Sequence, residues 1–145
     1  MSSVDCYNIN IDQWFEAPPV HKERADASSC EQGDFIYTFG GLKFSAGYQL
    51  ADIERLNAIQ FTQQKRNNAG STLAWELMNI TTEDTIILTR RENAVMAPLN
   101  ERQILILGGD GESGFKSDAY ILNTETSSIH QVSPDLGFRV CTWSN

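Results

Sequence analysis

The chain is poor in basic residues and has no long apolar run. Its 145 residues include 11 Lys and Arg against 19 Asp and Glu, which gives a formal net charge of −8. Surfaces that bind nucleic acid need clustered Lys and Arg, and the short pairs Lys65-Arg66 and Arg90-Arg91 are typical of solvated loop charges. A membrane-spanning helix needs roughly 18 or more consecutive apolar residues, and no such stretch occurs. The composition therefore argues against nucleic acid and against a membrane as partners.

Cysteine is scarce and irregularly placed. Cys6, Cys30 and Cys141 form an odd set. Each lies in a predicted strand, where a free thiol behaves as a small hydrophobe. A disulfide framework is not expected from such a set. The N-terminus is polar and acidic, without the pattern of a secretory signal. We therefore expect a cytoplasmic protein, because free thiols are typical of the reducing cytosol.

Residue sets that carry chemistry are also lacking. Only two histidines occur, His21 and His130, and neither has a partner at metal-ligand spacing. The segment 110–114 is acidic and rich in glycine but lacks the spacing of a calcium loop, so it is interpreted as a tight turn. No nucleophile elbow is present. The sequence predicts no catalytic residues, no metal site and no cofactor.

The chain does contain an internal repeat. The doublets Gly40-Gly41 and Gly108-Gly109 each close an apolar strand, and each is followed by an Asp that opens another strand ending in Asn, at 52–57 and 118–123. A third copy without glycines stands at 3–8. Self-similarity of this length indicates a repeat architecture. Trp14 follows Asn8 and Trp75 follows Asn57, whereas Ile129 takes the place of Trp after Asn123.

This pattern resembles the kelch family of β-propellers. The shared features are an arginine-led first strand, a second strand ending in Gly-Gly, a third strand from Asp to Asn and a fourth strand with Trp. The resemblance covers nearly the whole chain, although the second unit lacks its Trp and the first is stretched between Asn57 and Trp75. It implies an all-β fold of four-stranded blades. The expected divisions are the end of a preceding blade at 1–16, complete blades at 24–79 and 91–133, and the first strand of a next blade at 138–145.

The chain is too short for a closed propeller, which typically has roughly 4–8 blades. We therefore expect an incomplete ring that needs further blades or other chains. Either the chain is an excerpt from a longer protein, which we favour, or several chains complete the ring. The leading half unit and the tail would then share one composite blade, as is familiar in propellers.

Most residues of the repeat are expected to have structural roles. A glycine pair tolerates positive φ and lets the chain leave a strand sharply. Trp14 and Trp75 are predicted to fill the wedge between blades, where a large ring buries much apolar surface. The Asp and Asn residues at the strand ends are predicted to bond backbone groups in turns.

The alternation of antiparallel strands sorts the loops onto two faces. Loops from second to third strands and loops between blades, at 17–23, 42–51, 80–91 and 110–117, belong to one side, which we call face one. The other loops, at 9–12, 31–34, 58–72, 98–102 and 124–127, belong to the opposite side, face two. The insertion at 60–71 is polar and rich in amides, so we expect a mobile loop there.

Face one carries the candidate binding residues. Lys43, Phe44 and Tyr48 lie in one loop, and Phe115 and Lys116 lie in the equivalent loop of the next unit. Exposed aromatic rings beside charges are typical of protein interfaces, and in the kelch family this face commonly holds a partner. The alternative is that Phe44 and Phe115 fold back against their own units.

The resemblance implies a non-enzymatic module that binds other proteins and displays loops on a rigid scaffold. Two alternatives remain open. One is the substrate-recognition part of a ubiquitin-ligase adaptor. The other is a fragment of a kelch-type sugar oxidase or epimerase, although no motif brings the two His and four Tyr residues together.

Overall fold

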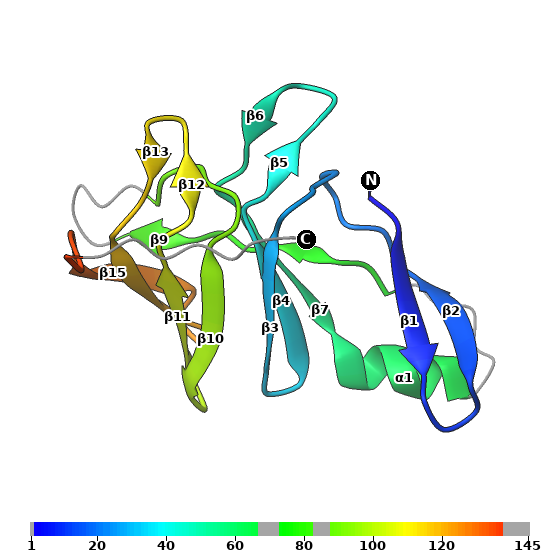
Figure 1. Ribbon diagram of the computed structural model, residues 1–145. Helices are drawn as coiled ribbons and strands as arrows, with labels where there is room; N and C mark the ends of the chain where they lie inside the picture. Colours follow the sequence, from blue (N-terminus) through cyan, green and yellow to red (C-terminus); the bar gives the residue numbers. More distant parts are fainter. Residues whose placement is uncertain (1, 67–72, 83–87, 138–145) are drawn as a thin grey trace.

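The computed structural model describes residues 2–66, 73–82 and 88–137. Within these ranges the protein is mostly β-strand with one helix, α1, so the all-β prediction is confirmed. Two largely antiparallel sheets lie side by side, and a separate two-stranded hairpin stands beside the first sheet (Figure 1). The tail at 138–145, predicted to be a strand, lies outside the described residues.

The two sheets repeat one strand order, in which successive strands are neighbours. The first sheet has the order β3-β4-β7-β8, and the second has β10-β11-β14-β15 with β9 added in parallel to β15. The second and third strands pair in the same register in both sheets, with Phe35 opposite Asn57 and Gln103 opposite Asn123. The strands of the two sheets are β3 (Ser28–Gln32), β4 (Phe35–Phe39), β7 (Ile53–Asn57), β8 (Glu76–Leu77), β9 (Thr81–Thr82), β10 (Val95–Asn100), β11 (Gln103–Leu107), β14 (Ala119–Asn123) and β15 (Ser128–Ser133).

Three hairpins and one helix complete the described structure. The separate hairpin stands at the N-terminus. In each of the two sheets, one short hairpin connects the second strand to the third. Their strands are β1 (Val4–Asn8) and β2 (Gln13–Ala17), β5 (Leu42–Lys43) and β6 (Tyr48–Gln49), and β12 (Asp110–Gly111) and β13 (Gly114–Phe115). The helix α1 (Ala58–Arg66) follows β7 directly.

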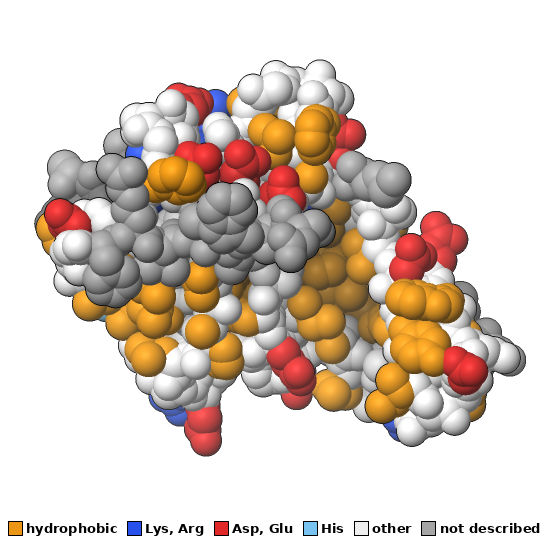
Figure 2. All heavy atoms as spheres, in the orientation of Figure 1, with side chains coloured by type: hydrophobic (Ala, Val, Ile, Leu, Met, Phe, Trp, Pro, Cys, Tyr) orange, Lys and Arg blue, Asp and Glu red, His pale blue; other side chains and the backbone are white. Residues whose placement is uncertain are grey.

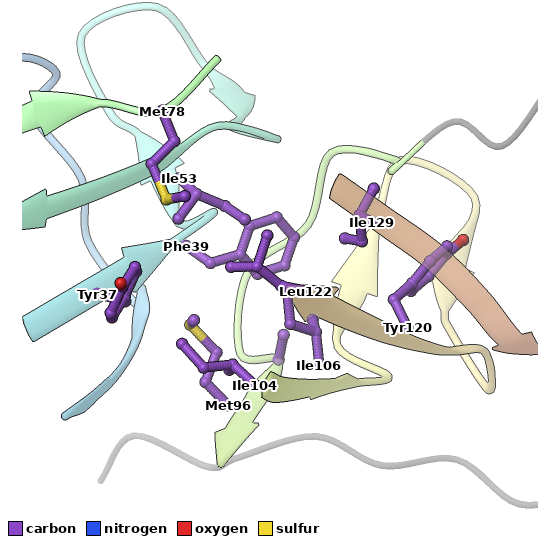
Figure 3. Packing of buried hydrophobic residues seen from close by; sticks show 11 residues of the cluster. Tyr37, Phe39, Ile53, Met78, Met96, Ile104, Ile106, Tyr120, Leu122 and Ile129 are labelled. Carbon is purple, nitrogen blue, oxygen red and sulfur yellow. The ribbon is translucent and has the colours of Figure 1, made fainter. Parts of the chain in front are cut away.

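The main core lies between the two sheets (Figure 3). Phe39 and Ile53 come from the first sheet, and their side chains have no exposed surface. The second sheet contributes Ile104, Ile106 and Leu122, which alternate with half-buried neighbours because successive side chains of a strand point to opposite faces. Each such side chain contributes about 1.5–3 kcal/mol when fully buried. Packing between the two sheets is therefore the main source of apolar stabilisation for the sheets themselves.

The glycine doublets are required by close approach of another backbone segment. Gly40 has a φ of 66°, and a Cβ atom there would lie 2.3 Å from the main-chain oxygen of Arg91. The next residue, Gly41, donates its N–H to that same oxygen at 2.9 Å. At Gly109, with a φ of 101°, a Cβ atom would lie 2.7 Å from the oxygen of Glu92. The expected positive φ is confirmed, and the backbone approach explains why no larger residue fits.

Trp75 fills the space between the N-terminal hairpin and the first sheet, in a small core with Val20 and Leu56. Only 5% of its surface is exposed. The indole N–H donates to the carbonyl of Pro18 at 2.9 Å, and the carbonyl of Trp75 bonds His21 Nε2 at 2.6 Å. The predicted burial of Trp75 is confirmed. Trp75 lies directly before β8.

The equivalent prediction for Trp14 is wrong. This ring is 69% exposed and lies on the outer side of the N-terminal hairpin, opposite Tyr7. The two ring centroids are 5.0 Å apart. Both tryptophans follow a strand that ends in Asn, as the sequence pattern indicates. Trp14 is exposed because no described element covers the outer side of β2.

The insertion after β7 is a helix where the sequence predicted a mobile loop. Asn57 caps it, since its side-chain oxygen accepts the N–H of Gln60 at 2.8 Å. Phe61, only 5% exposed, anchors the helix. The many Gln, Lys and Arg residues are good helix formers, so the polar composition that suggested disorder instead forms the solvent side of α1. Residues 67–71 of the predicted loop lie outside the described residues.

The two predicted faces are visible in Figure 1. The hairpins β5–β6 and β12–β13 project from the side that also carries the link from β2 to β3, which is face one. The turns β3–β4 and β10–β11 and helix α1 lie on the opposite side. The alternation of antiparallel strands therefore placed these loops correctly.

Replacing Trp75 with Ala should lower the free energy of unfolding by about 3–5 kcal/mol, because it leaves a cavity between the hairpin and the first sheet. Trp14→Ala is the matched control, and it should cost about 1 kcal/mol or less because that ring is exposed. Chemical denaturation of both variants checks this. Equal losses would show that the indole of Trp75 is not the wedge described here.

Candidate partner-binding face

The predicted binding residues lie on two equivalent β-hairpins. Lys43 and Tyr48 are cross-strand partners in β5–β6. Phe44, next to Lys43, is 71% exposed, and Phe115 in β13 is 48% exposed. The ring of Phe44 is therefore largely solvated, and that of Phe115 is half exposed. Lys116 follows directly after β13.

Local bonds hold both hairpins in shape. In β5–β6, Gly47 has a φ of 68° and donates its N–H to the carbonyl of Lys43 at 2.9 Å. Glu23 accepts the N–H of Ser45 at 2.9 Å. Hydrogen bonds from Ser45 lower the pKa of Glu23, and the positive charge of Lys43 lowers it further. In the other hairpin, Lys116 donates to Ser113 Oγ at 2.7 Å.

Arg90 connects the two hairpins. Its guanidinium lies 5.1 Å from the ring centre of Tyr48 and 3.8 Å from Glu112 Oε1. Sequence reasoning treated Arg90 as a solvated loop charge, and its 56% exposed side chain is indeed solvated, but it also bridges two structural units. A shallow pocket of about 720 Å³ opens beside it, lined by Ala51, Leu88, Thr89, Arg90, Glu112, Ser113 and Lys116.

A buried arginine supports this face from below. Arg91 has no exposed surface, and its guanidinium donates to the carbonyl of Gly108 at 2.9 Å and to both carboxylate oxygens of Asp118 at 2.5 and 3.0 Å. Its Nε donates to the carbonyl of Thr89 at 3.1 Å. One side chain thus joins three segments: Thr89 just before it, the glycine doublet at Gly108, and Asp118 at the start of β14.

The first sheet has the same clamp, built on Arg24. Its guanidinium donates to the carbonyl of Gly40 at 2.7 Å and to Asp52 at 2.9 Å, and it also bonds Glu54. The expectation that the Asp residues bond backbone groups is incomplete: Asp118 does accept a backbone hydrogen bond, but both Asp52 and Asp118 also bind arginine. The same expectation is confirmed for the Asn residues: Asn123, for example, accepts the N–H of Glu125 at 3.0 Å.

The spacing of these pairs is a signal that sequence reasoning missed. Arg24 and Asp52 are 28 residues apart, and Arg91 and Asp118 are 27 apart. Both members occur in the two complete units of the repeat at nearly constant separation. A recurring pair of opposite charges within a repeat indicates a structural ion pair better than either residue does alone.

The surroundings of Asp118 set its charge state. Burial alone would raise the pKa of this carboxyl, but the Arg91 guanidinium and the hydroxyl of Tyr120, which donates to Oδ2 at 2.8 Å, hold the pKa below its usual value. Burial and the neighbouring carboxylate together raise the pKa of Tyr120. Asp118 is therefore ionised and Tyr120 neutral near pH 7, which matches the hydrogen bonds observed.

The described part of the chain holds no metal cluster and no membrane-spanning helix. Within residues 2–66, 73–82 and 88–137, no group of three or more His, Cys, Asp or Glu residues could hold a metal ion. No helix of these ranges is long and apolar enough to cross a membrane. Cys6 and Cys30 are free thiols, and burial raises the pKa of Cys30 to about 11.

Comparison with known proteins adds no family assignment. No protein-family model matches the chain, and none of the curated proteins matches it. The surface itself consists of two firmly held hairpins that present aromatic rings and charges of both signs on one side.

Asp118→Asn should lower the free energy of unfolding at pH 7 by about 3 kcal/mol or more, because it leaves the buried Arg91 guanidinium without its counter-charge. The control is Arg90→Ala, which removes the exposed pair with Glu112 and should cost about 1 kcal/mol or less. Denaturant titrations of both variants measure the difference.

The effect of Asp118→Asn should also depend on pH. The folded-state pKa of Asp118 lies below its unfolded value of about 3.9, so its contribution is present above that value and is lost as the pH falls through the lower folded-state pKa. The difference between wild type and Asp118→Asn should therefore narrow below about pH 4. A constant difference from pH 7 to pH 2.5 would contradict the ion-pair assignment.

Proposed function

We propose that the chain is part of a kelch-type β-propeller and that face one is its protein-binding surface. The propeller assignment is supported by two sheets that repeat the same order of four antiparallel strands, β3-β4-β7-β8 and β10-β11-β14-β15, and that share one core. It is also supported by the glycine doublets and the Arg–Asp clamps, which recur in both units. In this interpretation the sheets are blades, the N-terminal hairpin is half a blade, and further blades or other chains complete the ring.

The observation that carries the binding proposal is the exposure of Phe44 and Phe115 on equivalent hairpins. Each ring keeps a large exposed surface that a partner could bury, and exposed aromatic side chains flanked by charges are typical of binding hot spots. The rings emerge from hairpins whose shapes are fixed by local hydrogen bonds. Because the hairpins are already ordered, binding a partner would cost them little conformational entropy.

The mechanism is rigid display, without covalent chemistry. The Arg24 and Arg91 clamps hold the bases of the two hairpins, and Arg90 links the hairpins to each other. A partner protein contacts both hairpins at once, so its affinity depends on their spacing. We place this activity in the cytoplasm, where the free thiols of Cys6 and Cys30 are stable.

The test compares two triple variants in pull-downs from cell extract followed by binding titration of the captured protein. Phe44→Ala, Tyr48→Ala and Phe115→Ala together remove the rings of face one, and the affinity should fall at least about tenfold. The matched control removes three exposed apolar side chains on face two, Ile11→Ala, Ile59→Ala and Leu99→Ala. It should leave the affinity unchanged.

A reversed result would contradict the proposal. If the face-two variant loses the principal partner while the face-one variant keeps it, the binding surface lies around α1 and the lower turns. Melting temperatures of both variants separate loss of binding from loss of fold.

A further inference from the structure

Glu92 lies where the two sheets and the two hairpins of face one meet. Its N–H donates to the carbonyl of Asp110 in β12 at 2.9 Å, and its carbonyl accepts the N–H of Asp110 at 2.8 Å. The next residue, Asn93, donates its N–H to the carbonyl of Asp26, which lies just before β3, at 2.9 Å. The side chain of Glu92 accepts a hydrogen bond from that of Gln49 in β6. This one residue therefore contacts both hairpins at the place where the sheets meet.

The fold does not require a carboxylate at this position. Arg24 and Arg91 are equivalent in the repeat, so Glu92 corresponds to Ala25. Ala25 makes the same main-chain bridge with Leu42 of β5, with hydrogen bonds of 2.9 and 2.7 Å. The bridge thus needs only the backbone, and an alanine side chain is sufficient in the first unit. The carboxylate of Glu92 therefore has no role in the bridge itself.

The surroundings of this carboxylate favour its neutral form. Its Oε2 is buried and has no hydrogen-bond partner among the described residues. Burial raises the pKa of Glu92, the negative charges of Asp26 and Asp110 raise it further, and the hydrogen bond from Gln49 offsets only part of this rise. Figure 2 shows acidic side chains in the gap between the two hairpins. An ionised carboxylate that is partly desolvated and faces like charges is destabilised.

The nearby basic side chains are engaged with other groups. Their partners are Asp118 for Arg91, Glu112 for Arg90 and Ser113 for Lys116. Within the described part of the chain, Glu92 is therefore opposed by two carboxylates and compensated by one neutral amide. Uptake of a single proton removes this imbalance.

We propose that Glu92 is a proton-operated switch in the contact between the two sheets. When Glu92 is ionised it repels Asp26 across the contact, and when it has taken up a proton this repulsion is removed and the contact is tighter. The folded-state pKa of Glu92 lies above the unfolded value of about 4.3. The stabilisation is therefore complete below that value and is lost as the pH rises through the folded-state pKa. The hairpins of face one are held together more firmly in mild acid than at neutral pH, whether or not a partner is bound.

Hydrogen exchange in the intact chain measures the contact directly. The amides of Gly41, Arg91 and Asn93 donate across it from one unit to the other. After correction for the intrinsic effect of pH, their protection should rise at least about twofold as the pH falls from about 7 to about 4.5. Glu92→Gln, which keeps the shape of the side chain but cannot ionise, should show the higher protection at both pH values. Equal protection in wild type and Glu92→Gln at every pH would overturn the proposal.

The matched control is Glu101→Gln, the same change at an exposed carboxylate in the turn between β10 and β11. This variant should keep the pH dependence of the wild type. If it removes the dependence as Glu92→Gln does, the effect is one of net charge and the switch is not Glu92.

An NMR titration of the Glu92 carboxyl carbon tests the cause of the effect. Its midpoint in the wild type should lie above the usual range for Glu, and Asp26→Asn should lower it because a negative charge across the contact is removed. The variant suits the backbone, since Asp26 has a φ of 53° and the equivalent residue of the second unit is Asn93, with a φ of 52°. A midpoint that Asp26→Asn leaves unchanged would show that the two carboxylates do not interact across the contact, and the proposal would fail.

Discussion

The fold depends above all on the buried guanidinium of Arg91. Its side chain bonds the carbonyl of Gly108 and the carboxylate of Asp118 within the second sheet, while its main-chain oxygen accepts the N–H of Gly41 from the first sheet. A fully buried charge is tolerable only when it is paired and hydrogen-bonded. The glycine doublet, the Asp at the start of the third strand and the packing of one sheet on the next therefore form a single arrangement and not three separate features.

This arrangement also explains why one side of the molecule can present exposed rings without losing order. The hairpins β5–β6 and β12–β13 begin directly after the glycine doublets, at the points where the arginine clamps hold the chain. Local bonds such as that between Glu23 and Ser45 then fix their tips. Mobility is thus restricted at both ends of each hairpin, and Phe44 and Phe115 are held at a set separation by the packing of the two sheets.

Much of the fold could be predicted from the periodicity of the sequence. The predictions fail where contacts between distant parts of the chain determine the structure. The strands of the repeat, the positive φ of the glycines and the sides taken by the loops depend on local sequence and on strand alternation, so they could be predicted. Helix α1 could not, because a single buried ring, Phe61, and the cap at Asn57 override a polar composition. The exposure of Trp14 depends on which element lies beside β2, and Arg90 gains its bridging role only from the approach of two hairpins distant in sequence. Such contacts leave no periodic signal.

The two sheets contribute different surfaces to their contact. The first sheet contributes its glycine doublet, and the second contributes the backbone around Arg91. Interfaces of this head-to-tail kind repeat by rotation in one sense and end either in a closed ring or in an open array. They do not generate two-fold symmetric pairs. If further sheets packed on these two in the same way, the sense of rotation and the number of sheets would be set by the contact between Arg91 and the glycine doublet.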